Sequence, residues 1–382
     1  MRESFSLGHV AGIRIGVNWS VLVIFAIIAF GLAEGRLPQA HPDHPRLLYW
    51  GLGLATAVVF FGSLLAHELS HAVMARRHGL EVGGIVLWLF GGVARLGGDA
   101  PNPRAELRIA GVGPLVSLLL GLGFALITWL LAVTTGITLV SEAFAWLAGI
   151  NILLALFNSI PAAPLDGGRL LRAFLWWRTG DRLRAASGAS RAGQFTGWLL
   201  TVLGLYQVLL GRAFGGIWLV LIGWFVLAAA SAEGGQAQVR RLLAGVPVRE
   251  VMSSAPVTVP PDLPVEDFLA APPAGRRHAT FPVTADGGGP VGLLTLDRAR
   301  RVPPGERRST TAGEVMAPMD RVVTAGPDES LAEVLPRMDG SEERRVLVLE
   351  EGGLVGIVSP SDISRAVNWA MSSGAPGPSG IR

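Results

Sequence analysis

Six apolar stretches, each long enough to cross a lipid bilayer, dominate the first 240 residues and constrain the fold more than any other feature. They lie at 16–34, 47–75, 106–133, 143–163, 195–211 and 215–232. A helix rises about 1.5 Å per residue, so roughly 20 apolar residues cover about 30 Å of hydrocarbon. Because hydrophobic residues make up 50% of the chain and charged residues only 16%, we predict an α-helical polytopic membrane protein. Its first stretch is predicted to be a retained helix, since further stretches follow it.

The distribution of arginine predicts the orientation of these helices. Every basic residue is Arg. If the N-terminus is cytoplasmic, most of the arginines that connect the helices lie on the cytoplasmic side: Arg76, Arg77, Arg104, Arg108, Arg169, Arg172, Arg178, Arg182, Arg184 and Arg191. The outer loops then hold only Arg36, Arg46 and Arg212. The positive-inside rule thus predicts a multi-pass protein of the cell membrane with a cytoplasmic N-terminus. No basic cluster indicates a nucleic-acid partner.

The density of charged residues changes near residue 240 and marks a domain boundary. Residues 241–368 carry Arg, Asp and Glu at the density of a soluble protein. The last residues are rich in Gly, Ser and Pro and offer little to bury. We therefore predict a membrane domain at 1–240, a cytoplasmic domain at 241–368 and a disordered tail at 369–382.

The second apolar stretch ends in a motif that is typical of zinc hydrolases, His67-Glu68-Leu69-Ser70-His71. On a helix, the two histidines lie one turn apart on the same face and can bind one metal ion. Glu68 is placed to accept a proton from water that the metal activates. The chain contains no Cys, so His and carboxylates are the available zinc ligands. The alternative, polar side chains that only reach for the membrane surface, would leave costly groups in an apolar helix.

A third ligand is expected because a catalytic zinc usually takes three protein side chains and leaves one position open. The segment 158–168 ends the fourth apolar stretch with two prolines and contains one acidic residue, Asp166. Prolines break a helix, and the freed backbone groups are tolerated at membrane depth only beside protein or a water-filled cavity. We predict that Asp166 is the third ligand. The alternative is an Asp that caps a helix just outside the membrane.

In their order and sequence, these two motifs resemble the site-2 protease family of intramembrane zinc metalloproteases, peptidase family M50. The resemblance implies that His67, His71 and Asp166 hold one Zn²⁺, that Glu68 is the general base and that Asn158 is a polar helper near the scissile peptide. The implied substrate is a transmembrane protein, such as an anti-sigma factor or another membrane-bound regulator. For Asn158, an ordinary interhelical hydrogen bond is an equal alternative.

The segment 82–96 is too short for another span. It is β-branched and aromatic, with paired glycines, which is typical of strands joined by a tight turn. The resemblance to the site-2 protease family implies a short membrane-associated β-hairpin or sheet here, whose edge can hold an extended substrate segment by strand addition. A re-entrant packing loop is the alternative.

The cytoplasmic domain contains an internal repeat of roughly 65 residues. Residues 249–252, Arg-Glu-Val-Met, recur at 313–316 as Gly-Glu-Val-Met, and 291–295 recur at 355–359. The repeat resembles a tandem pair of CBS modules, at 245–302 and 310–368. Such pairs form an α/β unit, so the resemblance implies a C-terminal α/β domain through which the chain forms a homodimer.

The resemblance to CBS modules also implies an adenine-nucleotide site. The second copy carries the family's Gly-x-x-Ser/Thr-x-x-Asp motif as Gly356, Ser359 and Asp362. In the first copy Arg298 stands at the acidic position, so that site is predicted to be lost. A pair that serves only for dimerisation or docking is the alternative, because the motif is short and half-broken.

The function predicted from these features is regulated intramembrane proteolysis, in which a zinc endopeptidase hydrolyses a peptide bond in or near a transmembrane segment. Two alternatives stay open. One is a CBS-regulated membrane transporter, in which the metal site is structural or transports ions. The other is an inactive protease-like scaffold. Glu68 beside the first His favours hydrolysis, since transport gives it no role.

Overall fold

The computed structural model describes residues 4–88, 91–270, 279–285 and 289–372. The chain forms two compact units, Met1–Gly235 and Gln236–Arg382. The domain boundary predicted at residue 240 falls inside a single helix, α8 (Ala213–Leu243). Each unit is described by itself below.

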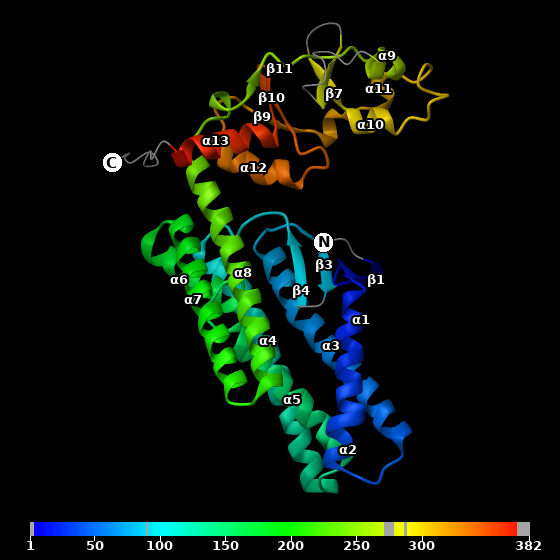
Figure 1. The fold of residues 1–382 in the computed structure, drawn as a ribbon, viewed down its shortest axis with the longest axis vertical. Coiled ribbons are helices and arrows are strands. Elements are labelled where there is room, and N and C mark those ends of the chain that lie inside the picture. The colour runs from blue at the N-terminus through cyan, green and yellow to red at the C-terminus, as the bar shows by residue number, and fades with distance from the viewer. Residues whose placement is uncertain (1–3, 89–90, 271–278, 286–288, 373–382) are drawn as a thin grey trace. The chain divides into compact units, whose positions relative to one another are not determined.

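Long helices make up most of the first unit (Figure 1). They are α1 (Ser20–Phe30), α3 (Arg46–Arg77), α4 (Pro103–Thr135), α5 (Leu139–Asn158), α7 (Arg182–Leu209) and α8. Helix α1 continues through η1 (Gly31–Arg36) into α2 (Leu37–Ala40). Within the described residues, five helical segments are long and apolar enough to cross a membrane, namely 20–40, α3, α4, α5 and α8.

The predicted stretch at 195–211 lies in α7, a continuous helix of 28 residues that is not among those five. Glutamines, threonines and glycines lower its hydropathy. Its glycines have a packing role, because a Cβ at Gly197 would lie 2.8 Å from the Gly223 carbonyl and one at Gly204 would lie 2.7 Å from the Gly216 carbonyl. Small residues let membrane helices approach closely, so α7 packs tightly along α8.

A four-stranded sheet accompanies these helices. The predicted hairpin forms as β3 (Val82–Trp88) and β4 (Gly91–Leu96), which are antiparallel. Two strands that the sequence did not reveal, β1 (Phe5–Val10) and β2 (Ile13–Val17), extend it in the order β1-β2-β3-β4. The first apolar stretch was therefore predicted to begin too early, since residues 16 and 17 belong to β2 and α1 begins at Ser20.

The sheet packs on α3 through a buried cluster of apolar side chains: Ile13, Val21, Ala72, Ile85 and Leu87. Strand β2 runs parallel to β3, with Ile15 opposite Ile85. The far side of the sheet ends in β4, which is an edge strand. This edge lies beside the half of α3 that carries the histidines.

The fourth apolar stretch ends earlier than predicted, at Asn158 rather than residue 163. The chain then turns back within seven residues, and α6 (Asp166–Thr179) begins at Asp166. Two glycines make this turn possible, because a Cβ at Gly167 would overlap the Ile160 carbonyl and one at Gly168 would lie 2.5 Å from the carbonyl carbon of Ala162. Asp166 is thereby fixed at the first turn of α6.

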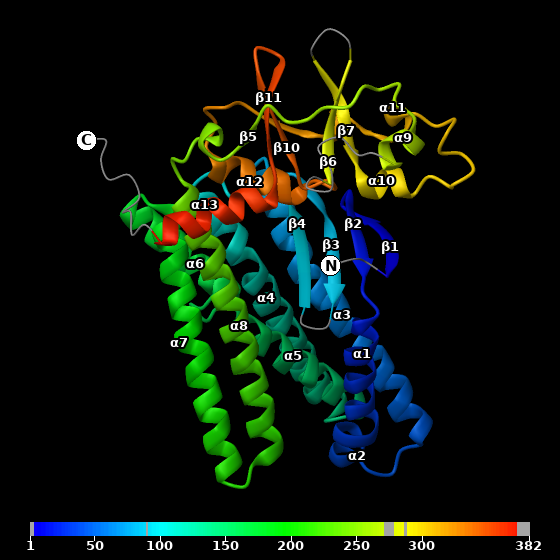
Figure 2. The same ribbon diagram turned by 45° about the horizontal axis from the view of Figure 1, so that its top comes forward.

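The second unit contains two small sheets, which the view of Figure 2 displays. One has the order β5-β11-β10-β9 and the other β6-β7-β8. The strands are β5 (Ser253–Ser254), β6 (Thr280–Thr284), β7 (Pro290–Thr295), β8 (Ala317–Pro318), β9 (Val323–Ala325), β10 (Val346–Glu350) and β11 (Gly353–Val358). The helices are α9 (Val265–Ala270), α10 (Leu296–Arg300), α11 (Ala312–Val315), α12 (Leu331–Gly340) and α13 (Pro360–Ser372), with short turns η2 (Val248–Glu250) and η4 (Met319–Arg321).

The two repeats exchange strands. Strand β5 of the first repeat pairs with β11 of the second, and β8 of the second pairs with β7 of the first. Neither repeat completes its sheet alone, so the pair is one α/β unit. The tail was predicted to begin at 369, but α13 continues to Ser372, and 373–382 lie outside the described residues.

Candidate metal centre

Three of the predicted site residues converge on one point. His67 and His71 lie on α3 with their Nε2 atoms 3.2 Å apart. The Oδ2 atom of Asp166 lies 3.2 Å from His67 Nε2 and 3.1 Å from His71 Nε2. Ligands about 2.0–2.1 Å from a tetrahedral zinc ion are roughly 3.3 Å apart. The three side chains therefore fit zinc, and they are the one such group among the described residues.

The other ring nitrogen of each histidine is bonded to α4. His71 Nδ1 donates to the Ile109 carbonyl at 2.6 Å, and His67 Nδ1 pairs with Ser117 Oγ at 2.9 Å. A carbonyl can only accept, so the proton of neutral His71 is on Nδ1 and the Nε2 lone pair is available to a metal. The sequence did not predict Ile109 or Ser117, because only the packing of α4 on α3 brings them to the histidines.

Helix α4 comes closest to the metal centre at a glycine, Gly113. A Cβ at Gly113 would overlap His71 Nε2 and would lie 2.8 Å from His67 Nε2. Pro114 follows directly and lies inside the helix. Glycine here leaves room between the two ligand nitrogens, and any side chain would enter that room.

Glu68 is half-buried on α3 and contacts the edge strand. Its Oε1 accepts a hydrogen bond from the backbone N–H of Gly92 in β4, at 3.2 Å. A Cβ at Gly92 would lie 2.5 Å from the Glu68 carboxyl carbon. The strand backbone therefore runs directly against the carboxylate next to the metal ligands.

Asn158 is the last residue of α5 and is half-buried. None of the hydrogen bonds described for this unit joins its side chain to Glu68, His67, His71 or Asp166. The structure places Asn158 directly before the turn that leads to Asp166, and its role stays a prediction.

The residues predicted to bind a nucleotide make contacts with other residues of the second unit. The buried Asp362 carboxylate accepts hydrogen bonds from the Ser359 N–H at 2.8 Å and from Ser253 Oγ at 3.3 Å, and it pairs with Arg365. Gly356 packs on Met252, since a Cβ there would lie 2.5 Å from the Met252 sulfur. Part of the motif therefore has a structural role.

Each CBS repeat borders a cavity at an equivalent position. The cavity beside Asp362 measures about 470 Å³ and is also lined by Glu250, Arg365 and Trp369. The other measures about 540 Å³ and is lined by Arg298 and Glu314, among other residues. Arg298 also forms ion pairs with Glu342 and Glu343, which do not line the cavity. Of Gly356, Ser359 and Asp362, only Asp362 lines the first cavity.

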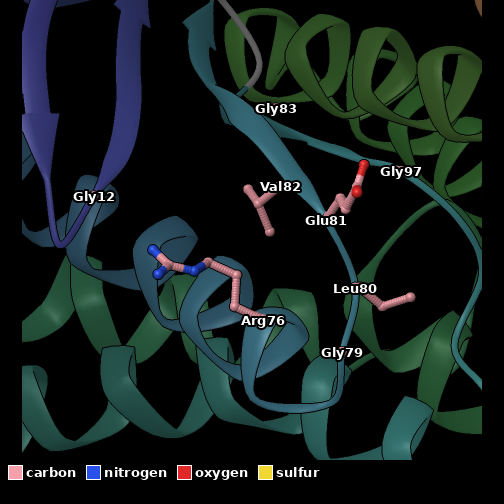
Figure 3. Close-up of a pocket in the computed structure, with 8 residues that line it drawn as sticks. All are labelled: Gly12, Arg76, Gly79, Leu80, Glu81, Val82, Gly83 and Gly97. Atoms are coloured by element: carbon pink, nitrogen blue, oxygen red, sulfur yellow. The ribbon is translucent and has the colours of Figure 1, made fainter.

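Figure 3 shows a larger cavity in the first unit, of about 710 Å³. Its lining is Gly12, Arg76, Gly79, Leu80, Glu81, Val82, Gly83 and Gly97. The Arg76 guanidinium donates to the Ala11 carbonyl at 2.6 Å. Because no predicted ligand or catalytic residue lines this cavity, it is separate from the metal centre.

Comparisons with known proteins agree with the two kinds of unit. The model of peptidase family M50 matches residues 55–140 and 132–200, and the CBS domain model matches 248–305 and 312–368. The Mycobacterium tuberculosis protein that bears the name zinc metalloprotease Rip3 is 45% identical over 370 residues, covering 96% of this chain and 94% of its own. A Synechocystis protein with the name zinc metalloprotease sll0528 is 31% identical, with 97% of each chain covered.

Among solved structures, the site-2 protease from Methanocaldococcus jannaschii is 28% identical, with a TM-score of 0.42, and the match covers 60% of this chain and 94% of that one. The identity to the curated relatives extends through both units. The chain is therefore a metalloprotease that belongs to peptidase family M50, the site-2 protease family, in the branch that carries a pair of CBS domains.

Proposed function

We propose that the chain is an intramembrane endopeptidase that hydrolyses a peptide bond in or near a transmembrane segment of another membrane protein. The convergence of His67, His71 and Asp166 beside Glu68, at the end of an apolar helix, carries this proposal. Zinc, when bound by these three residues, would polarise water and the peptide carbonyl. Family membership favours this function over transport, and the complete set of polar groups favours it over an inactive scaffold.

The protein side chains supply the proton transfers. Glu68 takes a proton from water while the water oxygen attacks the carbonyl carbon. Glu68 then passes that proton to the amide nitrogen as the C–N bond breaks. The hydrogen bond from Gly92 fixes the carboxylate for this task. Asn158 stays our candidate for a polar helper, on its place in the motif alone.

The edge strand offers a way to present the substrate. A peptide bond within a transmembrane helix is hydrogen-bonded and shielded, so the helix must unwind before water can attack. Strand β4 is at the edge of its sheet and contacts Glu68. An unwound segment that paired with β4 would therefore lie beside the general base, with main-chain hydrogen bonds in place of those lost.

A comparison of membrane proteomes tests this function. Cells that carry a Glu68→Gln variant should accumulate uncut transmembrane proteins, such as anti-sigma factors or other membrane-bound regulators, that wild-type cells process. Identical membrane proteomes would count against the proposal. By the positive-inside argument the N-terminus and the CBS pair are cytoplasmic, and so is the end of α3 that carries His71 and Arg77. The cleavage products should therefore appear on that side.

Removing the Ser117 hydroxyl should weaken zinc binding. Ser117→Ala leaves His67 Nδ1 without its partner, so the ring loses its fixed orientation, and the zinc affinity should fall about 10–100-fold. Competition with a chromogenic chelator measures it. Ser63→Ala is the matched control, because among the described residues this buried α3 hydroxyl hydrogen-bonds only to the Val59 carbonyl of its own helix. Equal zinc affinities in the two variants would remove the role assigned to Ser117.

We further propose that the CBS pair binds an adenine nucleotide and regulates cleavage, and that it can link two copies of the chain. The 470 Å³ cavity lined by Asp362, Arg365 and Trp369 supports this site. It offers an anionic ribose acceptor, a cation for phosphate and an aromatic ring for a base.

Asp362→Asn should weaken nucleotide binding about 10–100-fold, because a hydrogen bond to a charged group contributes about 1.5–3 kcal/mol. Titration calorimetry of the full chain with AMP and ATP measures the affinity and should find one site per chain. Arg298→Ala, in the other cavity, should leave it unchanged. Binding that depends on Arg298 and not on Asp362 would reverse the assignment of the two cavities.

A further inference from the structure

A buried ion pair joins α4 to the helix that carries Asp166. Glu106 on α4 is fully buried, at 0% exposure. Arg172 on α6 donates to its Oε1 through Nε at 2.8 Å and also through a terminal nitrogen, and Arg169 Nε lies 3.9 Å from the same oxygen. Glu106 Oε2 is buried without a hydrogen-bond partner among the described residues. The charge of Glu106 is thus balanced by α6.

Glu106 lies on the same face of α4 as the residues that contact the metal ligands. Glu106, Ile109, Gly113 and Ser117 follow the spacing i, i+3, i+7, i+11, so they lie on one face of the helix. The Ile109 carbonyl and the Ser117 hydroxyl are hydrogen-bonded to His71 and His67, and Gly113 leaves space between the two imidazole nitrogens. Glu106 is the next position on this row and holds α6, whose first residue is Asp166.

We propose that Glu106 is a positioning residue for Asp166 and acts through Arg172. One face of α4 would then position all three metal ligands. It orients the rings of His67 and His71 directly, and it positions Asp166 indirectly by holding α6. A zinc site tolerates errors of only about 0.2 Å in its ligand distances, and Asp166 follows directly on the non-helical turn 159–165. A fixed α6 supplies the required precision. This inference rests on the proposed zinc-dependent function.

Loss of one partner costs more in a buried ion pair than in an exposed one. Arg172 Nη1 already donates to Glu233 Oε1 at 3.4 Å. When Glu106 loses its charge, Glu233 is the remaining acidic partner of Arg172 among the described residues, so α6 should shift toward Glu233 and solvent. Asp166 would move with the helix. The effect therefore appears at Asp166, six residues or roughly 1.7 turns of α6 from Arg172.

A double-mutant cycle on the full-length chain tests the inference, with the zinc dissociation constant measured by chelator competition. Glu106→Gln and Arg172→Met should each raise that constant about 10–100-fold. The double variant should be no worse than either single variant, because the two residues act as one unit. Arg36→Met, which breaks the 2.8 Å ion pair to Glu142 elsewhere in this unit, should leave the zinc affinity unchanged.

Thermal unfolding of the zinc-free variants separates positioning from plain stability. A variant that unfolds at a lower temperature but binds zinc as tightly as wild type would overturn the inference, and so would additive losses in the cycle. Glu106→Asp, which keeps the charge and shortens the reach, should give a smaller loss of affinity and serves if Glu106→Gln does not fold. Failure of the wild-type chain to bind zinc would instead overturn the proposed function itself.

Discussion

Replacing Glu68 by Gln is expected to lower the rate of peptide-bond cleavage about 10²–10⁴-fold, the usual contribution of a general base. The amide keeps the shape of the side chain and can still accept the Gly92 hydrogen bond, but it cannot take a proton from water. Zinc binding should be retained, because Glu68 is not one of the three converging ligands. Cleavage of a transmembrane substrate in proteoliposomes and metal analysis of the same sample measure the two quantities.

Glu81→Gln is the matched control. Glu81 is an exposed carboxylate of the same unit and lines the separate cavity, so its replacement should leave cleavage and zinc content unchanged. Persistent cleavage by the Glu68 variant would remove the proposed mechanism. Loss of zinc together with activity would instead make Glu68 part of the metal site.

Placing a methyl group at Gly113 is expected to abolish zinc binding and, with it, activity. The added Cβ would overlap His71 Nε2 and lie 2.8 Å from His67 Nε2, so it would occupy the space that a metal needs. Alanine is otherwise a better helix former than glycine by about 1 kcal/mol. The zinc-free variant should therefore fold, and the loss should be specific to the metal.

Gly111→Ala provides the control on the same helix. The nearest atom to its added Cβ would be Leu170 Cδ2 at 3.7 Å, an ordinary contact, so zinc content and cleavage should match wild type. Retention of a full zinc equivalent by Gly113→Ala would mean that the metal does not lie where the three ligand atoms converge.

Those parts of the metal centre that depend on local spacing could be read from the sequence. A four-residue interval on a helix puts His67 and His71 on one face, and the prolines before Asp166 indicate where the apolar helix must end. Ile109, Ser117 and Glu106 escaped prediction because they are ordinary residues of a long apolar helix. Only tertiary packing turns its face toward the ligands.

The fold shows a similar division. Hydropathy placed the long helices, because burial in lipid demands long apolar runs whatever the packing. Strands β1 and β2 escaped because Ile13, Ile15 and Val17 merge with the apolar residues of α1, which hides their alternation. Ala11 and Gly12 have positive φ angles of 52° and 72°, and a turn of that kind was the missed signal.

The position of β4 at the edge of its sheet bears on which membrane proteins can be cut. Main-chain pairing recognises a group that every polypeptide has, so it cannot discriminate by side-chain identity. Selection would then be made by the cost of unwinding, which a Gly lowers by about 1 kcal/mol and a Pro by about 3 kcal/mol relative to Ala. A Leu-rich helix is spared by its own helicity and needs no inhibitor. The helix propensity of a substrate's transmembrane segment, rather than a consensus sequence, would then determine whether this enzyme cuts it.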